Sequence, residues 1–154
     1  MTMTRKTLPG YRDLSILGLQ VGGGYAHRVS LSGGVLIKEN HIVIAGSIQK
    51  AVDGARSIAP HGLKIEVEVR SVKELQQALK ARVDCVLLDN FQPSQVQTAL
   101  EIMSKHEYCP LIEVSGGLTE ANIVEYAIEG VDVLSVGSLT HSVKSLDLSL
   151  LINE

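Results

Sequence analysis

The sequence predicts an α/β fold in which parallel strands alternate with helices, and three observations support this prediction. Val, Ile, Leu, Ala and Gly are abundant, whereas the chain has one Phe and no Trp, which is typical of buried parallel strands. Short apolar runs alternate with segments of helical spacing. Residues suited to ligand binding recur at five successive strand ends, as at the rim of a β/α barrel. We therefore predict an open or incomplete parallel β/α barrel, TIM-like, formed by residues 1–154 as a single domain.

The first expected elements follow an extended start and a glycine-rich loop. VLIK at residues 35–38 predicts a short buried strand. Apolar residues then recur at helical spacing from Ile44 to Ile58, and Pro60 ends this expected helix. IEVEV at residues 65–69 alternates with period two and predicts the second strand.

The rest of the chain continues the alternation. Ser71 and Glu74 have the spacing of a capping box, before a helix that runs to about Ala81. The remaining expected elements are a strand at 85–89, a helix from Pro93 that carries Met103, a strand at 111–114, a helix that Thr119 caps and Gly130 ends, and strands at 131–137 and 146–152. Strands separated by single helices imply right-handed parallel crossovers.

Chemically useful residues stand at the carboxyl ends of five of these strands. In chain order they are Lys38, Glu68, Asp89 with Asn90, Ser115 with Gly116 and Gly117, and Gly137 with His141. Any single strand end is commonly polar because the chain leaves the sheet there. The whole set, however, would place a cation, two carboxylates and two glycine loops around one mouth, where β/α barrels build their sites.

The segment at residues 21–41 combines two glycine clusters with His27, Arg28 and Lys38. Glycine lets the backbone approach a ligand closely, and the planar guanidinium of Arg suits carboxylate or phosphate. Residues 1–41 contain five Lys or Arg and two acidic residues, whereas the other residues contain nine and fifteen. This charge distribution predicts a site for small anions in the first part of the chain.

Two later glycine motifs, VSGGLT and SVGSLTH, each follow a strand and lead towards a helix. Uncovered backbone N–H groups at such a position favour phosphate. One SGG motif is most often only a turn, but two in successive units favour phosphate binding.

The composition excludes several other classes of partner. The acidic remainder of the chain and the scarcity of aromatic residues argue against nucleic acid. No apolar run approaches the roughly 20 residues of a membrane span, and the N-terminus has no apolar signal core, so we expect no membrane partner and a cytoplasmic location. Cys85 and Cys109 lie in or beside apolar runs and are expected to be buried small side chains rather than disulfide or metal ligands.

Seven linked motifs resemble a known family. They are TRKTLPGYR, VGGGYAHR, LIKENHI, EVEV, LLDNF, EVSGG and VGSLTHS, and they extend from Thr4 to about Leu150. In order and spacing they closely resemble the catalytic barrel domain of the quinolinate phosphoribosyltransferases, or nicotinate-nucleotide pyrophosphorylases (carboxylating). The resemblance implies transfer of a phosphoribosyl group from phosphoribosyl pyrophosphate to quinolinate, giving nicotinate mononucleotide, pyrophosphate and carbon dioxide in NAD synthesis.

The resemblance also assigns roles to individual residues. Cations that would hold the two quinolinate carboxylates are Arg5, Lys6, His27, Arg28 and Lys38. Glu68 and Asp89 would act on the ribose hydroxyls and on a magnesium ion, directly or indirectly, and with Lys38 would form the catalytic set. Carboxylates there would also stabilise the positive charge that develops on the ribose. Groups that would receive phosphate are Ser115, Gly116, Gly117, Gly137 and His141.

The chain departs from the family pattern in a few places. Glu39 replaces the usual Asp before Asn-His, and Arg70 follows EVEV where an acid is common and could alter the charge near Glu68. The family also has a separate N-terminal domain that, in the dimer, covers the barrel mouth of the other subunit. The expectation is therefore a truncated first strand and either a homo-oligomer or a complementing N-terminal domain.

Other functions remain open at the level of sequence. One is a non-catalytic relative that binds a phosphorylated ligand or a partner subunit. Another is the related barrel protein associated with molybdenum transport, which Lys38 in LIKENH disfavours. An aldolase that uses Lys38 in a Schiff base is weaker still, because nothing in the sequence suggests a carbonyl substrate.

Overall fold

The computed structural model describes residues 1–26 and 28–152. Its strands form one six-stranded sheet in the order β1-β6-β5-β4-β3-β2, in which all neighbours are parallel. Their bounds are β1 Thr2–Met3, β2 Val35–Ile37, β3 Ile65–Val69, β4 Cys85–Asp89, β5 Leu111–Ser115 and β6 Val133–Val136. The curled sheet has β1 at one edge and β2 at the other, although these strands are consecutive in the chain. This confirms the predicted open parallel barrel, and the two residues of β1 make its first strand short.

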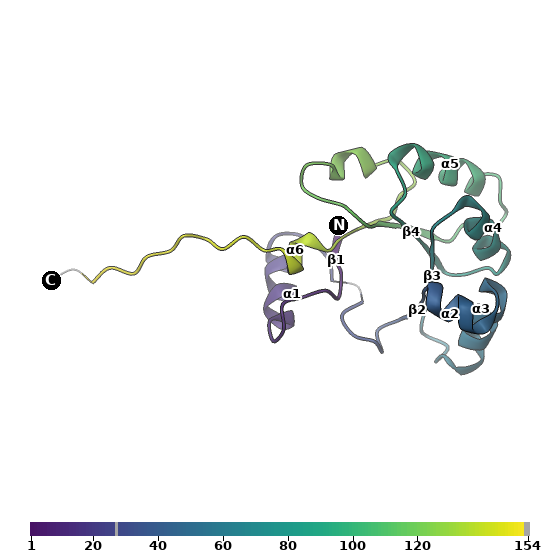
Figure 1. The fold of residues 1–154 in the computed structure, drawn as a ribbon, viewed down its shortest axis with the longest axis horizontal. Helices are drawn as coiled ribbons and strands as arrows, with labels where there is room; N and C mark the ends of the chain where they lie inside the picture. Colours follow the sequence, from purple (N-terminus) through teal and green to yellow (C-terminus); the bar gives the residue numbers. More distant parts are fainter. Residues whose placement is uncertain (27, 153–154) are drawn as a thin grey trace.

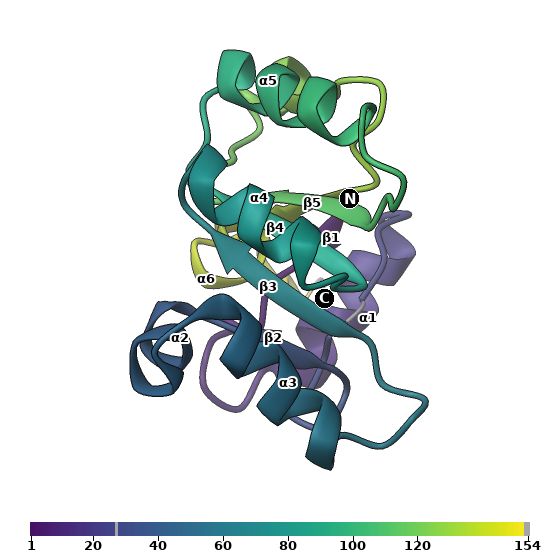
Figure 2. The ribbon, with the colours of Figure 1, turned by 90° about the vertical axis from the view of Figure 1, so that its right-hand side faces the viewer.

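The helices in the middle of the chain cover one face of the sheet. The bounds of the helices are α1 Arg12–Val21, α2 Glu39–Ala45, α3 Ile48–Ile58, α4 Val72–Lys80, α5 Pro93–Met103 and α6 Ser138–His141, with a 3-10 helix η1 at Ile123–Tyr126. Figure 1 shows α2 to α5 as an arc along the outside of the sheet, and Figure 2 looks at the sheet from the side of these helices, with α1 and α6 behind it. Among residues 1–26 and 28–152, no helix has the length and apolar character to cross a membrane.

The two faces of the sheet differ in chemistry. In β3, Val67 and Val69 are fully buried in the apolar core, whereas Glu66 and Glu68 line a cavity on the other face. The same alternation in β5 places Val114 in the core and its neighbours on the cavity face. Because side chains alternate along a strand, the outer face packs on helices and the inner face has polar groups. All residues of β3 are nevertheless buried.

The helix expected at residues 44–58 is two helices. Gly46 ends α2 in the left-handed conformation with φ 86°, and the hydroxyl of Ser47 accepts a hydrogen bond from the backbone of Lys50 to begin α3. The chain therefore turns between them, and Ile44, which the single helix would have buried, is 87% exposed. Glycine at the helix C-terminus and serine at the next N-cap are the residues that this turn needs.

The helix expected after Thr119 is also wrong, because only the short η1 forms there. The Asn122 side chain accepts a hydrogen bond from the backbone of Thr119 and donates one to the carbonyl of Gly117. Such local bonds from Asn to the backbone compete with helix formation. The segment from Gly117 to Asn122 is therefore a loop at the rim of the barrel.

Three further differences concern the ends of elements. The strand expected at 146–152 is an exposed extended segment outside the sheet (Figure 1). Helix α1 was not predicted from the sequence, and it contacts β1 at the start of the chain. At α4 the Ser71 hydroxyl caps Glu74 as predicted, but the Glu74 carboxylate accepts from the backbone of Arg70, one residue before the cap.

Candidate functional site

A cavity of about 670 Å³ occupies the inner face of the sheet and opens at the carboxyl ends of the strands. It is lined by nearly all residues that the sequence proposed for the site, namely Arg5, Lys6, Arg28, Lys38, Glu68, Asp89, Ser115, Gly116, Gly117, Gly137 and His141. His27, the remaining proposed residue, lies outside the described residues. The roles given to these residues stay predictions, but the fold brings them to one cavity.

The start of the chain delivers Arg5 and Lys6 to the cavity. β1 pairs with β6, and the guanidinium of Arg12, the first residue of α1, donates to the carbonyl of Arg5 over 3.1 Å. The hydroxyl of Thr140 in α6 donates to the carbonyl of Lys6 over 2.7 Å. The Nε atom of Arg5 is buried and has no hydrogen-bond partner among the described residues. An unpaired buried donor is unfavourable, so the cavity offers Arg5 to an acceptor on a ligand.

Arg28 enters the cavity from the loop between α1 and β2. Its Nε donates to the carbonyl of Gly34 over 3.2 Å. Burial and then the nearby positive charge of Arg5 lower the pKa of Arg28 from its ordinary value, while Glu66 and Glu113 act in the opposite direction. Two guanidinium groups thus lie near enough to repel each other, and an anionic ligand between them would relieve that repulsion.

Lys38 and Glu68 form a direct ion pair at the rim. The Nζ atom of Lys38 lies 2.5 Å from Oε2 of Glu68. Lys38 is the N-cap residue of α2, and its backbone N–H donates to Nδ1 of His41 over 2.9 Å. The turn into α2 therefore fixes the backbone from which the Lys38 side chain reaches the carboxylate of Glu68 in β3.

The strand ends of β4 and β5 meet in a tight loop contact. Asn90 has a positive φ of 57°, and its backbone N–H donates to the carbonyl of Ser115 over 2.9 Å. Gly116 has φ 89°, and a Cβ there would lie 2.4 Å from Oδ1 of Asn90. Only glycine fits this approach, so Asp89 and the Ser115–Gly117 loop are held side by side.

Gly137 gives His141 its place in the cavity. A Cβ at Gly137 would lie 2.9 Å from Nε2 of His141, so the imidazole ring packs where another residue would have a side chain. Nδ1 of His141 forms a hydrogen bond of 2.7 Å with the hydroxyl of Ser142. The loop that follows β6 and the imidazole ring of His141, one helical turn later, therefore both line the cavity.

Some residues of the inner face were not predicted to belong to the site. Glu66 and Glu113 are buried and line the cavity below the rim. The Sγ–H of Cys85 donates to Glu66 over 3.2 Å, and the hydroxyl of Ser135 donates to Glu113 over 2.5 Å. The signal was present in EVEV and LIEVS, where an acid alternates with valine in a strand buried on both faces.

The two cysteines differ. Cys85 is buried as expected, and burial with the nearby Glu66 carboxylate raises the pKa of its thiol, so it is a neutral hydrogen-bond donor. Cys109 is exposed, contrary to the expectation. Both thiols are free.

Glu68 and Asp89 fit the oxygen ligands that a magnesium ion prefers. Both line the cavity, and they are close enough for the guanidinium of Arg70 to contact each of them, at 3.6 Å and 3.4 Å. Glu68 is buried and Asp89 is partly exposed, so the two carboxylates differ in their access to water.

Fold and site together define an open parallel β/α barrel with a cavity lined by cations, acids and glycine loops at the carboxyl ends of its strands. The comparisons with known proteins then specify the family. Residues 1–151 match the model of the "Quinolinate phosphoribosyl transferase, C-terminal domain" family. The chain belongs to this family.

Individual relatives agree with this assignment. The chain is 49% identical to a probable nicotinate-nucleotide pyrophosphorylase [carboxylating] of Methanocaldococcus jannaschii, covering 96% of this chain and 53% of the relative. It is 43% identical to the human nicotinate-nucleotide pyrophosphorylase [carboxylating], covering 96% and 50%. The solved structure of the Francisella tularensis enzyme is 42% identical with a TM-score of 0.87, covering 96% and 51%. The chain thus spans about half the length of these relatives.

Proposed function

We propose that this chain provides the catalytic barrel of a quinolinate phosphoribosyltransferase, which forms nicotinate mononucleotide in NAD biosynthesis. The observation that carries the proposal is the arrangement of Arg5 and Arg28. Both line one cavity, burial and then the charge of Arg5 lower the pKa of Arg28, and Arg5 has a buried donor without a partner among the described residues. Two such cations suit a small dianion such as quinolinate. The relatives' names support the same reaction.

In the proposed reaction the cavity first orients the pyridine. Arg5, Lys6, Arg28 and Lys38 hold the two carboxylates, and His27 is assigned to the same group from its motif. The ring nitrogen then faces the anomeric carbon of phosphoribosyl pyrophosphate, and this positioning supplies much of the rate. The nitrogen–carbon bond forms as the carbon–oxygen bond to pyrophosphate breaks.

The acidic residues act on the sugar. Positive charge develops on the ribose as pyrophosphate leaves, and the carboxylates of Glu68 and Asp89 stabilise it. These residues would also hold a magnesium ion, which supplies charge neutralisation for pyrophosphate oxygens when it is bound. Phosphate groups are assigned to Ser115, Gly116, Gly117, Gly137 and His141.

The second step is loss of carbon dioxide. The electrons of the broken carbon–carbon bond move towards the quaternised ring nitrogen, and a proton then replaces the lost carboxylate. The protein need only hold the ring and exclude water from it. The proposal includes a cytoplasmic enzyme that requires magnesium and works as a homo-oligomer or with a complementing N-terminal domain.

Two substitutions test the assignment of residues. Arg28→Ala should weaken quinolinate binding by roughly 1.5 to 3 kcal/mol, because a charge-assisted hydrogen bond is lost, and should leave phosphoribosyl pyrophosphate binding nearly unchanged. Asp89→Asn should do the reverse. Titration calorimetry with each ligand alone measures both effects.

Formation of nicotinate mononucleotide by the native chain is assayed in parallel, with magnesium and with and without the separately expressed N-terminal domain of a relative. Equal losses for both ligands in both variants would contradict the residue roles. Absence of product under every condition would contradict the function itself. The alternatives of a non-catalytic binder or a molybdenum-transport relative are not favoured by the relatives' names.

A further inference from the structure

Arg70 joins three carboxylates at the rim of the cavity. It directly follows β3, and its side chain lines the cavity. Nη1 contacts the carboxylate of Glu39, Nη2 lies 3.6 Å from Oε1 of Glu68, and Nε lies 3.4 Å from Oδ2 of Asp89. The planar guanidinium has donors in several directions, so one side chain connects the ends of β3 and β4 with the start of α2.

These contacts use the carboxylates that a divalent ion would need. Lys38 pairs with Oε2 of Glu68 and Arg70 approaches Oε1. Asp89 has Arg70 as a cationic neighbour as well. The cluster therefore contains two cations and three acids, and the protein itself neutralises most of its negative charge.

The contacts of Arg70 with Glu68 and Asp89 are loose. The 3.4 Å contact with Asp89 is at the outer limit for a hydrogen bond, and the 3.6 Å contact with Glu68 lies beyond it. The Arg70 side chain is also 49% exposed, so water screens its ion pairs. These two contacts are therefore weak enough for a divalent ion to displace the guanidinium from Glu68 and Asp89.

We propose that Arg70 is a positioning residue that competes with divalent cations for Glu68 and Asp89, an inference that rests on the proposed function. It keeps the affinity of the two carboxylates for a free ion low. The ion then binds well only together with the diphosphate of the sugar substrate, because the diphosphate brings the negative charge that the site otherwise lacks. The displaced guanidinium, which also contacts Glu39, would then be free to pair with the same diphosphate.

The test measures Mn²⁺ binding in the absence of quinolinate and phosphoribosyl pyrophosphate. Mn²⁺ serves as a probe because the free ion gives an electron paramagnetic resonance signal that binding reduces. Arg70→Gln should bind Mn²⁺ about tenfold more tightly than the native chain, because a positive charge beside both carboxylates is removed. Arg70→Lys should give an intermediate affinity, because lysine keeps the positive charge but lacks the planar guanidinium and its several donors.

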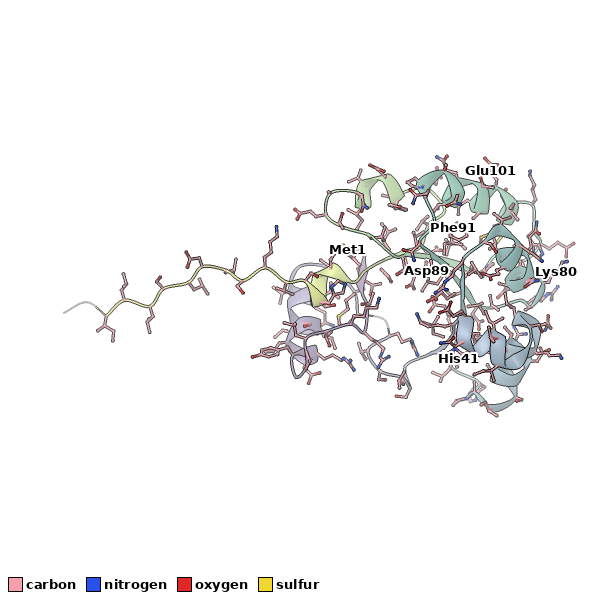
Figure 3. All side chains as sticks on the ribbon, viewed as in Figure 1. Met1, His41, Lys80, Asp89, Phe91 and Glu101 are labelled. Atoms are coloured by element: carbon pink, nitrogen blue, oxygen red, sulfur yellow. The ribbon has the colours of Figure 1, made fainter. Side chains whose placement is uncertain are left out.

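Two further variants show whether the effect is local. Lys80→Gln removes the same charge at the far end of α4, where Figure 3 shows Lys80 at the outer edge of the molecule, away from Asp89. Its Mn²⁺ affinity should stay within about twofold of the native value, because a distant exposed charge is screened. The double variant Arg70→Gln with Asp89→Asn should not bind Mn²⁺ more tightly than the native chain, because the Asp89 carboxylate is then missing as a metal ligand.

Equal or weaker Mn²⁺ binding by Arg70→Gln, with a native circular dichroism spectrum, would overturn the proposal. If Arg70→Gln does not fold, a Mn²⁺ affinity of Arg70→Lys equal to or weaker than that of the native chain would also overturn the proposal. The titration contains no substrate, so its result is independent of whether the native chain forms nicotinate mononucleotide. Failure of this inference and failure of the proposed function are therefore distinguishable.

Discussion

At the residue scale, the inner face of the sheet has acids where a filled barrel has apolar side chains. Glu66, Glu68 and Glu113 are all buried, and buried carboxylates are stable only when they are paired or hydrogen-bonded. Lys38 pairs with Glu68, and the thiol of Cys85 donates to Glu66. The buried Glu66 and Glu68 in the cavity wall therefore have donors from neighbouring side chains.

Thiol reactivity tests this view of Cys85. We expect Ellman's reagent at pH 8 to modify Cys109 and to leave Cys85 unmodified in the native chain. The thiolate is the reactive form, and burial together with Glu66 raises the pKa of Cys85, whereas Cys109 is exposed. The thiol count should be about one in the native chain and about two in denaturant.

Cys109→Ser is the control for this measurement. The variant should give no reaction until it is denatured. If the folded Cys109→Ser chain reacted as fast as the unfolded one, Cys85 would be accessible and the inner face would be open to reagents.

Residue identities at the rim could be read from the sequence because parallel strands place their carboxyl ends at one edge. Lys38, Asp89 and Gly137 followed apolar runs and line the cavity. Glu113 could not be found in this way, because it lies inside its strand rather than at the end. The contacts of Arg70 depend on side-chain geometry across three elements, which no local pattern contains.

At the element scale, the loops after β4 and β5 depend on two unusual backbone positions. Asn90 and Gly116 both have positive φ values, and their close approach joins Asp89 to the glycine loop. The left-handed conformation costs glycine little, so backbone strain lies at Asn90, and non-glycine residues held in this region are frequent at functional sites.

Gly116→Ala should destabilise the chain by about 2 kcal/mol or more, because it adds a left-handed penalty of about 1–2 kcal/mol to a clash with Asn90. The midpoint of thermal unfolding should fall by several degrees, since about 1 kcal/mol shifts it by roughly 2–4 °C in a domain of this size. Differential scanning calorimetry measures the change.

Gly54→Ala is the matched comparison, because Gly54 lies within α3 and a Cβ there would meet nothing within 4 Å. This substitution should stabilise the chain by about 0.5–1 kcal/mol through helix propensity. Equal effects of the two substitutions would show that the contact between Gly116 and Asn90 is not restrictive.

Element types were predictable where apolar runs were bounded clearly, as for β3, β4 and α5. The break at Gly46 was missed because apolar residues kept helical spacing across it, although Ile44 is exposed. The segment after Thr119 was missed because Asn122 bonds to the backbone of its own loop. In both segments, local backbone and side-chain bonds determined the structure more strongly than the periodicity of apolar residues did.

At the scale of the whole molecule, the order of the strands explains the shape of the site. β1 and β2 lie at opposite edges of the sheet, and the chain between them passes through α1 and the loop that carries Arg28. The cations of the first part of the chain therefore meet the acids of β3 and β4 in one cavity. The uneven charge distribution of the sequence becomes a group of cations beside a group of acids in that cavity.

The C-terminal segment 143–152 extends away from this body (Figure 1). Leu146, Leu148, Leu150 and Ile152 recur at every second position, Leu151 lies between the last two, and all of them are 81–92% exposed. An extended apolar segment with free backbone groups readily pairs with another chain. The segment adds nothing to the core of residues 1–142, since none of it is buried.

We therefore expect the chain to self-associate through this segment. Sedimentation velocity across a range of concentrations should show association of the full chain, and a variant that ends at Ser142 should sediment as a monomer. Substitution of Leu146, Leu148, Leu150 and Ile152 by Ser should have the same effect at full length, because association depends on apolar burial. The unfolding temperature of both variants at low concentration should match that of the full chain. A full chain that is monomeric at every concentration, or variants that associate equally, would show that another surface controls assembly.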